Sequence, residues 1–172
     1  MLKRGIFFLF LFISLTAASQ TYYIVRHAEK AAVDGNPNMS ATDPPLSEAG
    51  VQRAQDLLGV LKNESIGYIF STNTIRTRTT AEPLSKQSGV EIRTYGPRPD
   101  SLFIKVLKAL DKNVLIVGHS NTVDDIVNML CGEQKLSDLR DSEYDNLFVV
   151  TIKDGVASYE RRRFGSESPL GQ

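Results

Sequence analysis

Residues 22–27 read YYIVRH, an apolar run that ends on an arginine and a histidine. Residues 114–120 read VLIVGHS and repeat this arrangement with a second histidine. His27 and His119 are the two histidines of the chain, and each precedes the start of a helical pattern. Short apolar runs of this kind are typical of buried parallel strands, and ligands bind at the carboxyl edge of such sheets. We therefore expect the two imidazoles to lie side by side at that edge.

The rest of the chain alternates strand and helix patterns, which predicts an α/β fold. We expect a three-layer sandwich with a mostly parallel central sheet. The expected strands are residues 22–25, 66–70, 90–94 and 114–117, followed by a hairpin of 147–152 and 156–161 around Asp154-Gly155. The expected helices are residues 47–61, 74–87, 100–110 and 121–130. Residues 22–25 should be a central strand and 90–94 a peripheral one.

The composition is that of a globular domain, with 41% hydrophobic and 23% charged residues among 172. The formal net charge is zero, which argues against a general nucleic-acid-binding protein but permits a locally basic pocket. Three consecutive arginines at 161–163 are expected to be a solvated strand end. Cys131 is the only cysteine, so no internal disulfide is possible, and we expect it to be a small core residue.

The first twenty residues have the three parts of a secretory signal peptide. A basic start is followed by an apolar run over residues 5–15 and an Ala-x-Ser pattern at 17–19. We expect a signal peptide over residues 1–20, a folded domain over 21–164 and a loose tail over 165–172. The protein would then be secreted or periplasmic and contact a membrane only transiently, through the signal peptide. The alternative is a retained N-terminal anchor.

Arginines near the two histidines indicate a phosphate site. Guanidinium groups match phosphate oxygens bidentately, and a neutral imidazole is a competent nucleophile for a phosphoryl group. Arg26 precedes His27, and Arg76 and Arg78 occupy the first turn of the helix that follows the second strand. Backbone amides at a helix start add to an anion site. Arg78 is expected to be a solvated helix residue.

Four motifs resemble those of the histidine phosphatase superfamily, which contains phosphoglycerate mutase. They occur in the family's order: VRHA at 25–28, LSEAG at 46–50 followed by QRA at 52–54, STNTIRTRTTA at 71–81 and VGHS at 117–120. Ala28 stands where the family signature has glycine. The resemblance implies a phosphoglycerate mutase-like fold from a small phosphatase branch without a large cap insertion.

The resemblance also implies roles for the site residues. His27 would accept the phosphoryl group, while Arg26, Arg76 and His119 would bind its oxygens and stabilise the transition state. The same resemblance implies chemistry that needs no metal, and we expect no cofactor. The candidate substrate contacts are Ser120, Asn121 and Glu29.

The general acid is where the chain departs from the family. Phytase-like relatives follow the second histidine with aspartate, whereas this chain has Ser120. The candidates for a proton donor are Glu29, Asp100 and Asp124, although Asp100 is also expected to cap a helix.

Together these features predict a metal-independent histidine acid-type phosphatase. It would hydrolyse a phosphomonoester or a phosphoramidate through a phosphohistidine on His27, and the substrate would be a small phosphate ester or a phosphoprotein. The alternatives are a phosphoglycerate mutase-like phosphotransferase and a catalytically weak module that binds phosphate or phosphopeptides. A zinc site of His27, His119 and Glu29 is a further alternative, disfavoured by the adjacent Arg26.

Overall fold

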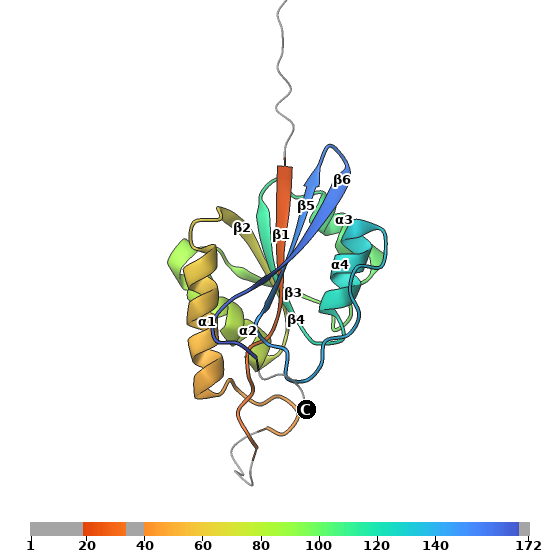
Figure 1. Cartoon of the computed structure of the whole chain (residues 1–172). Coiled ribbons are helices and arrows are strands. Elements are labelled where there is room, and N and C mark those ends of the chain that lie inside the picture. Colours follow the sequence, from red (N-terminus) through yellow and green to blue (C-terminus); the bar gives the residue numbers. More distant parts are fainter. Residues whose placement is uncertain (1–18, 34–39, 169–172) are drawn as a thin grey trace, which may run out of the picture.

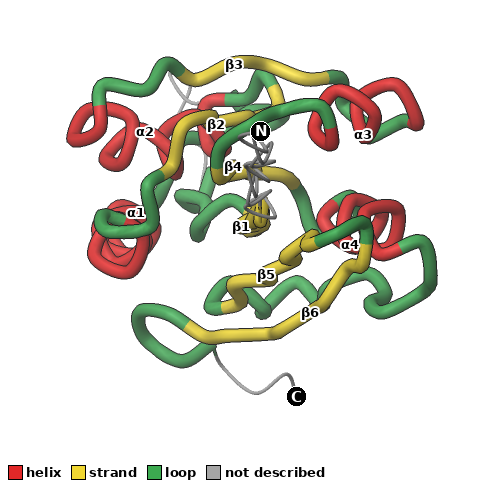
Figure 2. Tube along the Cα trace, turned by 90° about the horizontal axis from the view of Figure 1, so that it is seen from above, coloured by secondary structure: helices red, strands yellow, loops and turns green. Residues whose placement is uncertain are grey.

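A six-stranded sheet lies between two pairs of helices in the computed structural model, which describes residues 19–33 and 40–168 (Figure 1). Figure 2 shows α1 and α2 on one face of the sheet and α3 and α4 on the other. The strand order is β3-β2-β4-β1-β5-β6. The first four strands in this order pair in parallel, whereas β5 pairs antiparallel with both β1 and β6. The three-layer sandwich and the mostly parallel sheet are thus confirmed. In chain order the elements are β1 (Ser19–Arg26), α1 (Glu48–Leu61), β2 (Ile66–Thr72), α2 (Ile75–Ser88), β3 (Ile92–Tyr95), α3 (Ser101–Lys108), β4 (Asn113–Gly118), α4 (Val123–Cys131), β5 (Asn146–Lys153) and β6 (Val156–Arg163).

Strand β1 is central, and its side chains alternate between two hydrophobic cores. Tyr22 and Ile24 pack in the core beneath α3 and α4, while Tyr23 and Val25 pack in the core beneath α1 and α2. All four are buried, which is why this strand reads as apolar on both faces. Strand β3 is at the sheet edge, as its weaker pattern predicts.

The helix ends follow their sequence signals. The side chains of Ser47, Thr74 and Asp100 accept hydrogen bonds from the first turns of α1, α2 and α3. Gly89 and Gly132 adopt the left-handed conformation at the ends of α2 and α4. These signals set where each helix begins relative to the preceding strand, and therefore which side chains reach the edge of the sheet.

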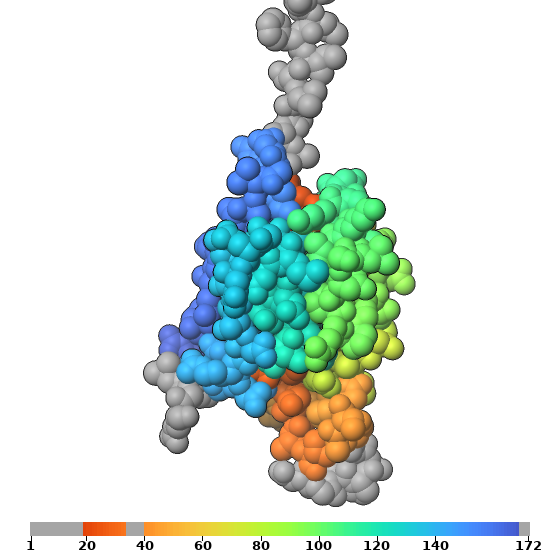
Figure 3. Space-filling view, turned by 90° about the vertical axis from the view of Figure 1, so that its right-hand side faces the viewer, coloured from red at the N-terminus to blue at the C-terminus, as the bar shows by residue number. Residues whose placement is uncertain are grey.

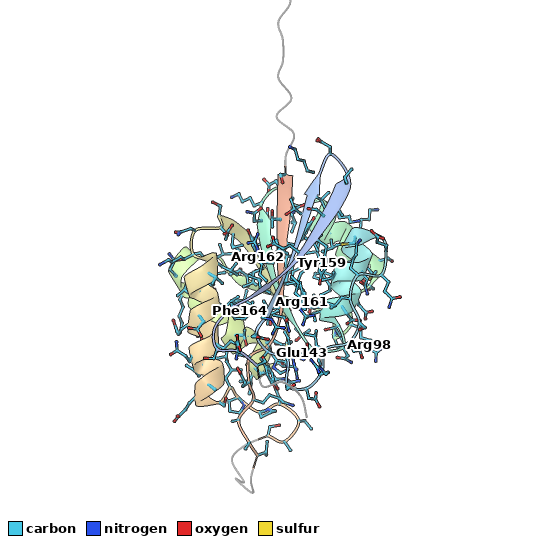
Figure 4. All side chains as sticks on the ribbon, viewed as in Figure 1. Arg98, Glu143, Tyr159, Arg161, Arg162 and Phe164 are labelled. Carbon is cyan, nitrogen blue, oxygen red and sulfur yellow. The ribbon has the colours of Figure 1, made fainter. Side chains whose placement is uncertain are left out.

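The three arginines at the end of β6 are exposed, as expected, and two of them also pair with the segment before β5. Arg161 contacts Glu143 at 3.0 Å, and the two are labelled in Figure 4. Arg163 contacts the buried Asp145 at 2.5 Å. Only Arg162 makes an exposed pair, with Glu160. All three side chains are exposed, so the prediction of a solvated strand end is confirmed, and a neighbouring loop adds carboxylate partners for two of them.

Both ends of the described chain are held more firmly than the sequence suggests. Strand β1 begins at Ser19, and the Gln20 side chain donates to the backbone carbonyls of Leu107 and Lys112. At the other end, the Ser168 hydroxyl accepts from the backbone of Tyr144 and Asp145, so the start of the expected loose tail is anchored. Residues 1–18 and 169–172 lie outside the described residues, as does most of the expected signal peptide. No helix of the described chain has the length and apolar character needed to cross a membrane.

Candidate active site

The two histidines meet at the carboxyl edge of the sheet, as the strand pattern predicts. Parallel pairing sets Val25 opposite Val117 and Arg26 opposite Gly118. The backbone N–H of His27 then donates to the carbonyl of Gly118 at 2.9 Å. As a result the rings of His27 and His119 lie edge to face with their centroids 5.4 Å apart. Figure 3 shows this end of the molecule at the bottom of the view, with the loop after β1 in orange.

His27 has the geometry of a nucleophile. Its Nδ1 lies 2.8 Å from the carbonyl oxygen of Ala28, and a carbonyl can only accept, so Nδ1 carries the proton. In the neutral ring the lone pair therefore belongs to Nε2. Burial, together with Arg26, His119 and Arg76, lowers the pKa of His27 from 6.5 to about 3. The imidazole is thus neutral, and able to attack, across the ordinary pH range.

Arg26 is held in a cup of backbone carbonyls from the segment before β5. Its Nη1 donates to the carbonyls of Arg140 and Asp141 at 3.0 Å, and its guanidinium stacks on the Tyr144 ring at 4.1 Å. The side chain is 4% exposed, so it is fixed in position. The Arg161 and Arg163 contacts keep this cup in place.

Arg76 reaches the site from the first turn of α2. Its Nη1 donates to the carboxylate of Asp43 at 3.0 Å, and both oxygens of that carboxylate also accept from the Ile75 N–H. Thr80 joins this helix to the loop after His27, because its hydroxyl accepts from the Ala28 N–H and donates to the Arg76 carbonyl. The Thr-Ala part of the motif thus has a physical role, which is to set the distance between Arg76 and His27.

Unpaired donors mark the site as one for an anion. Within the described residues, the Nε atoms of Arg26 and Arg76 are buried and have no hydrogen-bond partner. Buried guanidinium N–H groups without partners are costly, and a phosphate oxygen is a matched acceptor. Both arginines also lower the pKa of His27, so their charges act at this imidazole.

Glu29 is the predicted substrate contact that the structure places elsewhere. Both of its carboxylate oxygens accept from Nε of Arg53 at 2.9 Å, and Nη2 adds a bond of 2.6 Å. Arg53 is buried and also donates to the carbonyls of Phe164 and Ser166. Because a buried cation on α1 already binds this carboxylate, a substrate contact by Glu29 stays a prediction that these contacts do not support. The pair ties the loop after His27 to helix α1 and to the end of β6.

Gly50 explains the glycine of the second motif. A Cβ at this position would overlap the carbonyl oxygen of Glu29, so only glycine lets α1 approach the loop after His27 this closely. The Ser47 N–H donates to the same carbonyl at 2.9 Å. In this motif, Gly50 and Ser47 therefore serve to hold helix α1 against the loop after His27.

We expect Arg53→Ala to lower the free energy of unfolding by about 3–5 kcal/mol, because it leaves Glu29 without its buried partner. Arg162→Ala is the matched control, since the exposed Arg162–Glu160 pair should contribute about 1 kcal/mol or less. Urea unfolding of both variants measures this difference. Equal, small losses would show that the Arg53–Glu29 pair does not hold the loop.

The remaining predicted residues are the two that follow His119 and the three candidates for a proton donor. Ser120 is half-buried and Asn121 is exposed, and both follow His119 at the site. Asp100 caps α3 by accepting from the Phe103 N–H at 2.7 Å, and Glu29 is paired with Arg53. Of the three acid candidates, only Asp124 has a buried carboxylate oxygen without a partner among the described residues, and burial raises its pKa.

Three contacts at the site lie outside the sequence predictions. They are made by Asp43 to Arg76, by Thr72 to His119 and by Tyr144 to Arg26. Asp43 and Tyr144 lie in irregular segments without a periodic pattern, whereas Thr72 is the last residue of an apolar strand and could have been noticed for that reason. As for the zinc alternative, residues 19–33 and 40–168 contain no cluster of three His, Cys, Asp or Glu side chains arranged for a metal ion.

We expect acid to destabilise the ligand-free protein. The pKa of His27 falls from 6.5 to about 3 on folding and that of His119 to about 4, mainly through burial. Between about pH 6.5 and 4 the unfolded chain therefore binds more protons, so stability falls as pH falls, by up to ~1.4 kcal/mol per pH unit for each histidine. Urea unfolding between about pH 7 and 5 measures the slope, and His27→Ala should reduce it. A stability independent of pH there would contradict buried neutral histidines.

Known proteins are similar to this chain in sequence and in fold. Residues 22–96 match the family described as Histidine phosphatase superfamily (branch 1). The chain is 36% identical over 86 residues to the probable phosphoglycerate mutase GpmB of Photorhabdus laumondii. That alignment covers 50% of this chain and 40% of the relative's length.

Solved structures extend the similarity to nearly the whole chain. The candidate phosphohistidine phosphatase SixA of Agrobacterium tumefaciens is 22% identical, with a TM-score of 0.60 over 86% of this chain and 98% of that one. A phosphoglycerate mutase of Bacillus anthracis is 18% identical, with a TM-score of 0.59 over 84% of this chain and 92% of that one. At these identities the structures establish a common fold.

Proposed function

Since this chain belongs to the histidine phosphatase superfamily, we propose that it is a phosphatase that carries the phosphoryl group on His27. One observation supports this most directly. The neutral His27, with its lone pair on Nε2, lies beside His119 and within the field of Arg26 and Arg76. A nucleophile surrounded by fixed positive charge is what phosphoryl transfer requires.

The proposed reaction has two steps. Nε2 of His27 attacks phosphorus, the bond from phosphorus to the ester oxygen or amide nitrogen breaks, and the leaving atom takes up a proton. Water then attacks phosphorus, the P–N bond to His27 breaks, and inorganic phosphate leaves. Arg26 and Arg76 stabilise the charge on the equatorial oxygens in both steps. Asp124 is our candidate for the proton donor, on the strength of its raised pKa.

The substrate class we propose is a phosphomonoester, with a phosphoramidate such as protein phosphohistidine as the second candidate. The similarity in fold to SixA supports a phosphoramidate as a substrate candidate. The sequence similarity to a probable mutase supports small phosphate esters as candidates. We retain the proposal that the chain is exported, from the pattern of residues 1–19, with a mature start near Gln20. N-terminal sequencing of the protein from the producing cell tests this, and an intact Met1 would refute it.

Hydrolysis of p-nitrophenyl phosphate in the presence of EDTA tests the function. We expect turnover that survives exhaustive chelation, because the arginines supply the positive charge at the site. Phosphate binding without turnover would indicate a binding module instead. Transfer of the phosphoryl group to an added alcohol in preference to water would indicate a phosphotransferase. Loss of activity that only zinc restores would support the alternative hypothesis of a zinc site.

A further inference from the structure

A chain of hydroxyl groups lies behind the second histidine. Thr72, at the end of β2, is 2% exposed, and its Oγ1 lies 2.8 Å from Nε2 of His119. The same Oγ1 donates to Oγ1 of Thr77 at 3.1 Å, and Thr77 donates in turn to the Thr72 carbonyl at 2.8 Å. All three groups belong to the junction between β2 and α2, and none of them has a role in the proposed reaction.

The arrangement of these hydrogen bonds favours a hydrogen on Nε2 of His119. Each hydroxyl has one hydrogen to donate. Thr77 can donate to the carbonyls of Thr72 and Thr74, and its oxygen, which also lies 2.8 Å from the Thr74 hydroxyl, accepts from Thr72. With its hydrogen directed to Thr77, the Thr72 hydroxyl is an acceptor for His119. In this arrangement Nε2 of His119 carries a hydrogen, and in the neutral ring Nδ1 holds a lone pair.

Nδ1 of His119 is the nitrogen left for a ligand, because it makes no hydrogen bond to any described residue. The ring faces His27 on β1 at a centroid distance of 5.4 Å. The charged groups acting on it come from three elements: Arg26 from β1, Arg76 from α2, and Asp43 and Lys30 from the loop after β1. Burial contributes most, and with the three cations it outweighs Asp43, so the pKa of His119 falls to about 4.

We propose that Thr72 makes the free His119 a hydrogen-bond acceptor toward the ligand, so that the site takes up an oxyanion together with one proton. This inference rests on the proposed function, because it takes the phosphoryl group as the ligand of the histidine pair. A phosphate monoanion brings the proton on one of its own oxygens and donates it to Nδ1. Sulfate has no proton to donate, so it binds only after His119 has taken one from solvent.

Discrimination between these two anions separates the proposal from simple charge attraction. Sulfate carries two negative charges at a pH where phosphate carries one, so the arginines alone would favour sulfate. A preference for phosphate would point instead to the shared proton. Above the pKa of His119, the affinity for sulfate should fall about tenfold per pH unit, while that for phosphate stays level as long as phosphate keeps its proton.

Titration calorimetry with inorganic phosphate and with sodium sulfate, at about pH 5.5, tests the proposal. We expect the wild-type protein to bind phosphate at least ~10-fold more tightly than sulfate. In Thr72→Val the ring is free to move its hydrogen to Nδ1, so sulfate binding should strengthen and the ratio should fall at least ~5-fold. Thr94→Val is the matched control, because Thr94 is exposed on β3, and it should keep the wild-type ratio.

Nitrogen NMR of the wild-type protein provides a readout that needs no variant, since it reports which nitrogen of neutral His119 carries hydrogen. We expect Nε2–H, and an Nδ1–H tautomer would overturn the proposal. Equal affinities for the two anions, or a folded Thr72→Val with an unchanged ratio, would also overturn it. If neither anion binds, the phosphate site fails and the proposed function fails with it. Phosphate binding with no preference over sulfate would remove only this inference.

Discussion

Replacement of His27 by alanine is expected to lower kcat by about 10⁴-fold or more while leaving phosphate binding within a few-fold. The loss should be this large because no second nucleophile takes the same position. Ala28 hydrogen-bonds Nδ1 and thereby directs the lone pair of Nε2, an arrangement that serves only His27. Phosphate should still bind, because Arg26 and Arg76 are fixed by contacts that do not involve the imidazole.

Acid quenching during turnover of a phosphorus-labelled substrate identifies the nucleophile directly. Wild-type protein should retain label in an acid-labile, base-stable form on His27, and His27→Ala should retain none. Cys131→Ala serves as the control, because Cys131 lies at the end of α4, away from the carboxyl edge of β1. Label on Ser120 or Cys131 would mean that His27 has been assigned wrongly.

The positions of the two histidines could be predicted because they depend on strand patterns alone. Buried parallel strands read as short apolar runs, and the residue that follows each run must emerge at the same edge of the sheet. The register of β1 against β4 then sets His27 beside Gly118 without any further information. Arg76 could be predicted in the same way, since Thr74 marks the start of the helix that carries it.

The contacts that fix the site could not be predicted, because they depend on which distant side chains meet. Nothing local shows that Arg53 on α1 would claim Glu29, 24 residues earlier. The pairing of Arg161 with Glu143 likewise joins a residue of β6 to the segment before β5, 18 positions earlier in the chain. From the sequence alone, a carboxylate such as Glu29 beside a catalytic motif is therefore easily assigned to substrate binding, because its ion-pair partner is not known.

The second large effect is expected at Arg76, where alanine should lower kcat/KM by about 10²–10³-fold. Its side chain is 16% exposed and its Nε is buried without a hydrogen-bond partner among the described residues, while Asp43 accepts from Nη1. Loss of this group removes a preorganised donor from the transferring phosphoryl oxygens. Arg76→Lys should recover little of the activity, because an ammonium group cannot offer two parallel donors while also pairing with Asp43.

Arg78→Ala is the matched control, two residues along the same helix. Arg78 is exposed and its contact within the described residues is a weak one, to Asn73 at 3.3 Å, so activity should stay within about twofold of wild type. Steady-state kinetics on p-nitrophenyl phosphate compares the three variants, and urea unfolding confirms that each is folded. The comparison is informative because the two arginines have the same charge and lie in one helical turn. If they acted only by long-range attraction of an anionic substrate, either substitution would weaken that attraction. Equal, mild losses of activity in Arg76→Ala and Arg78→Ala would show that the site responds to positive charge in general. They would contradict a specific hydrogen-bonding role of Arg76 toward the phosphoryl oxygens.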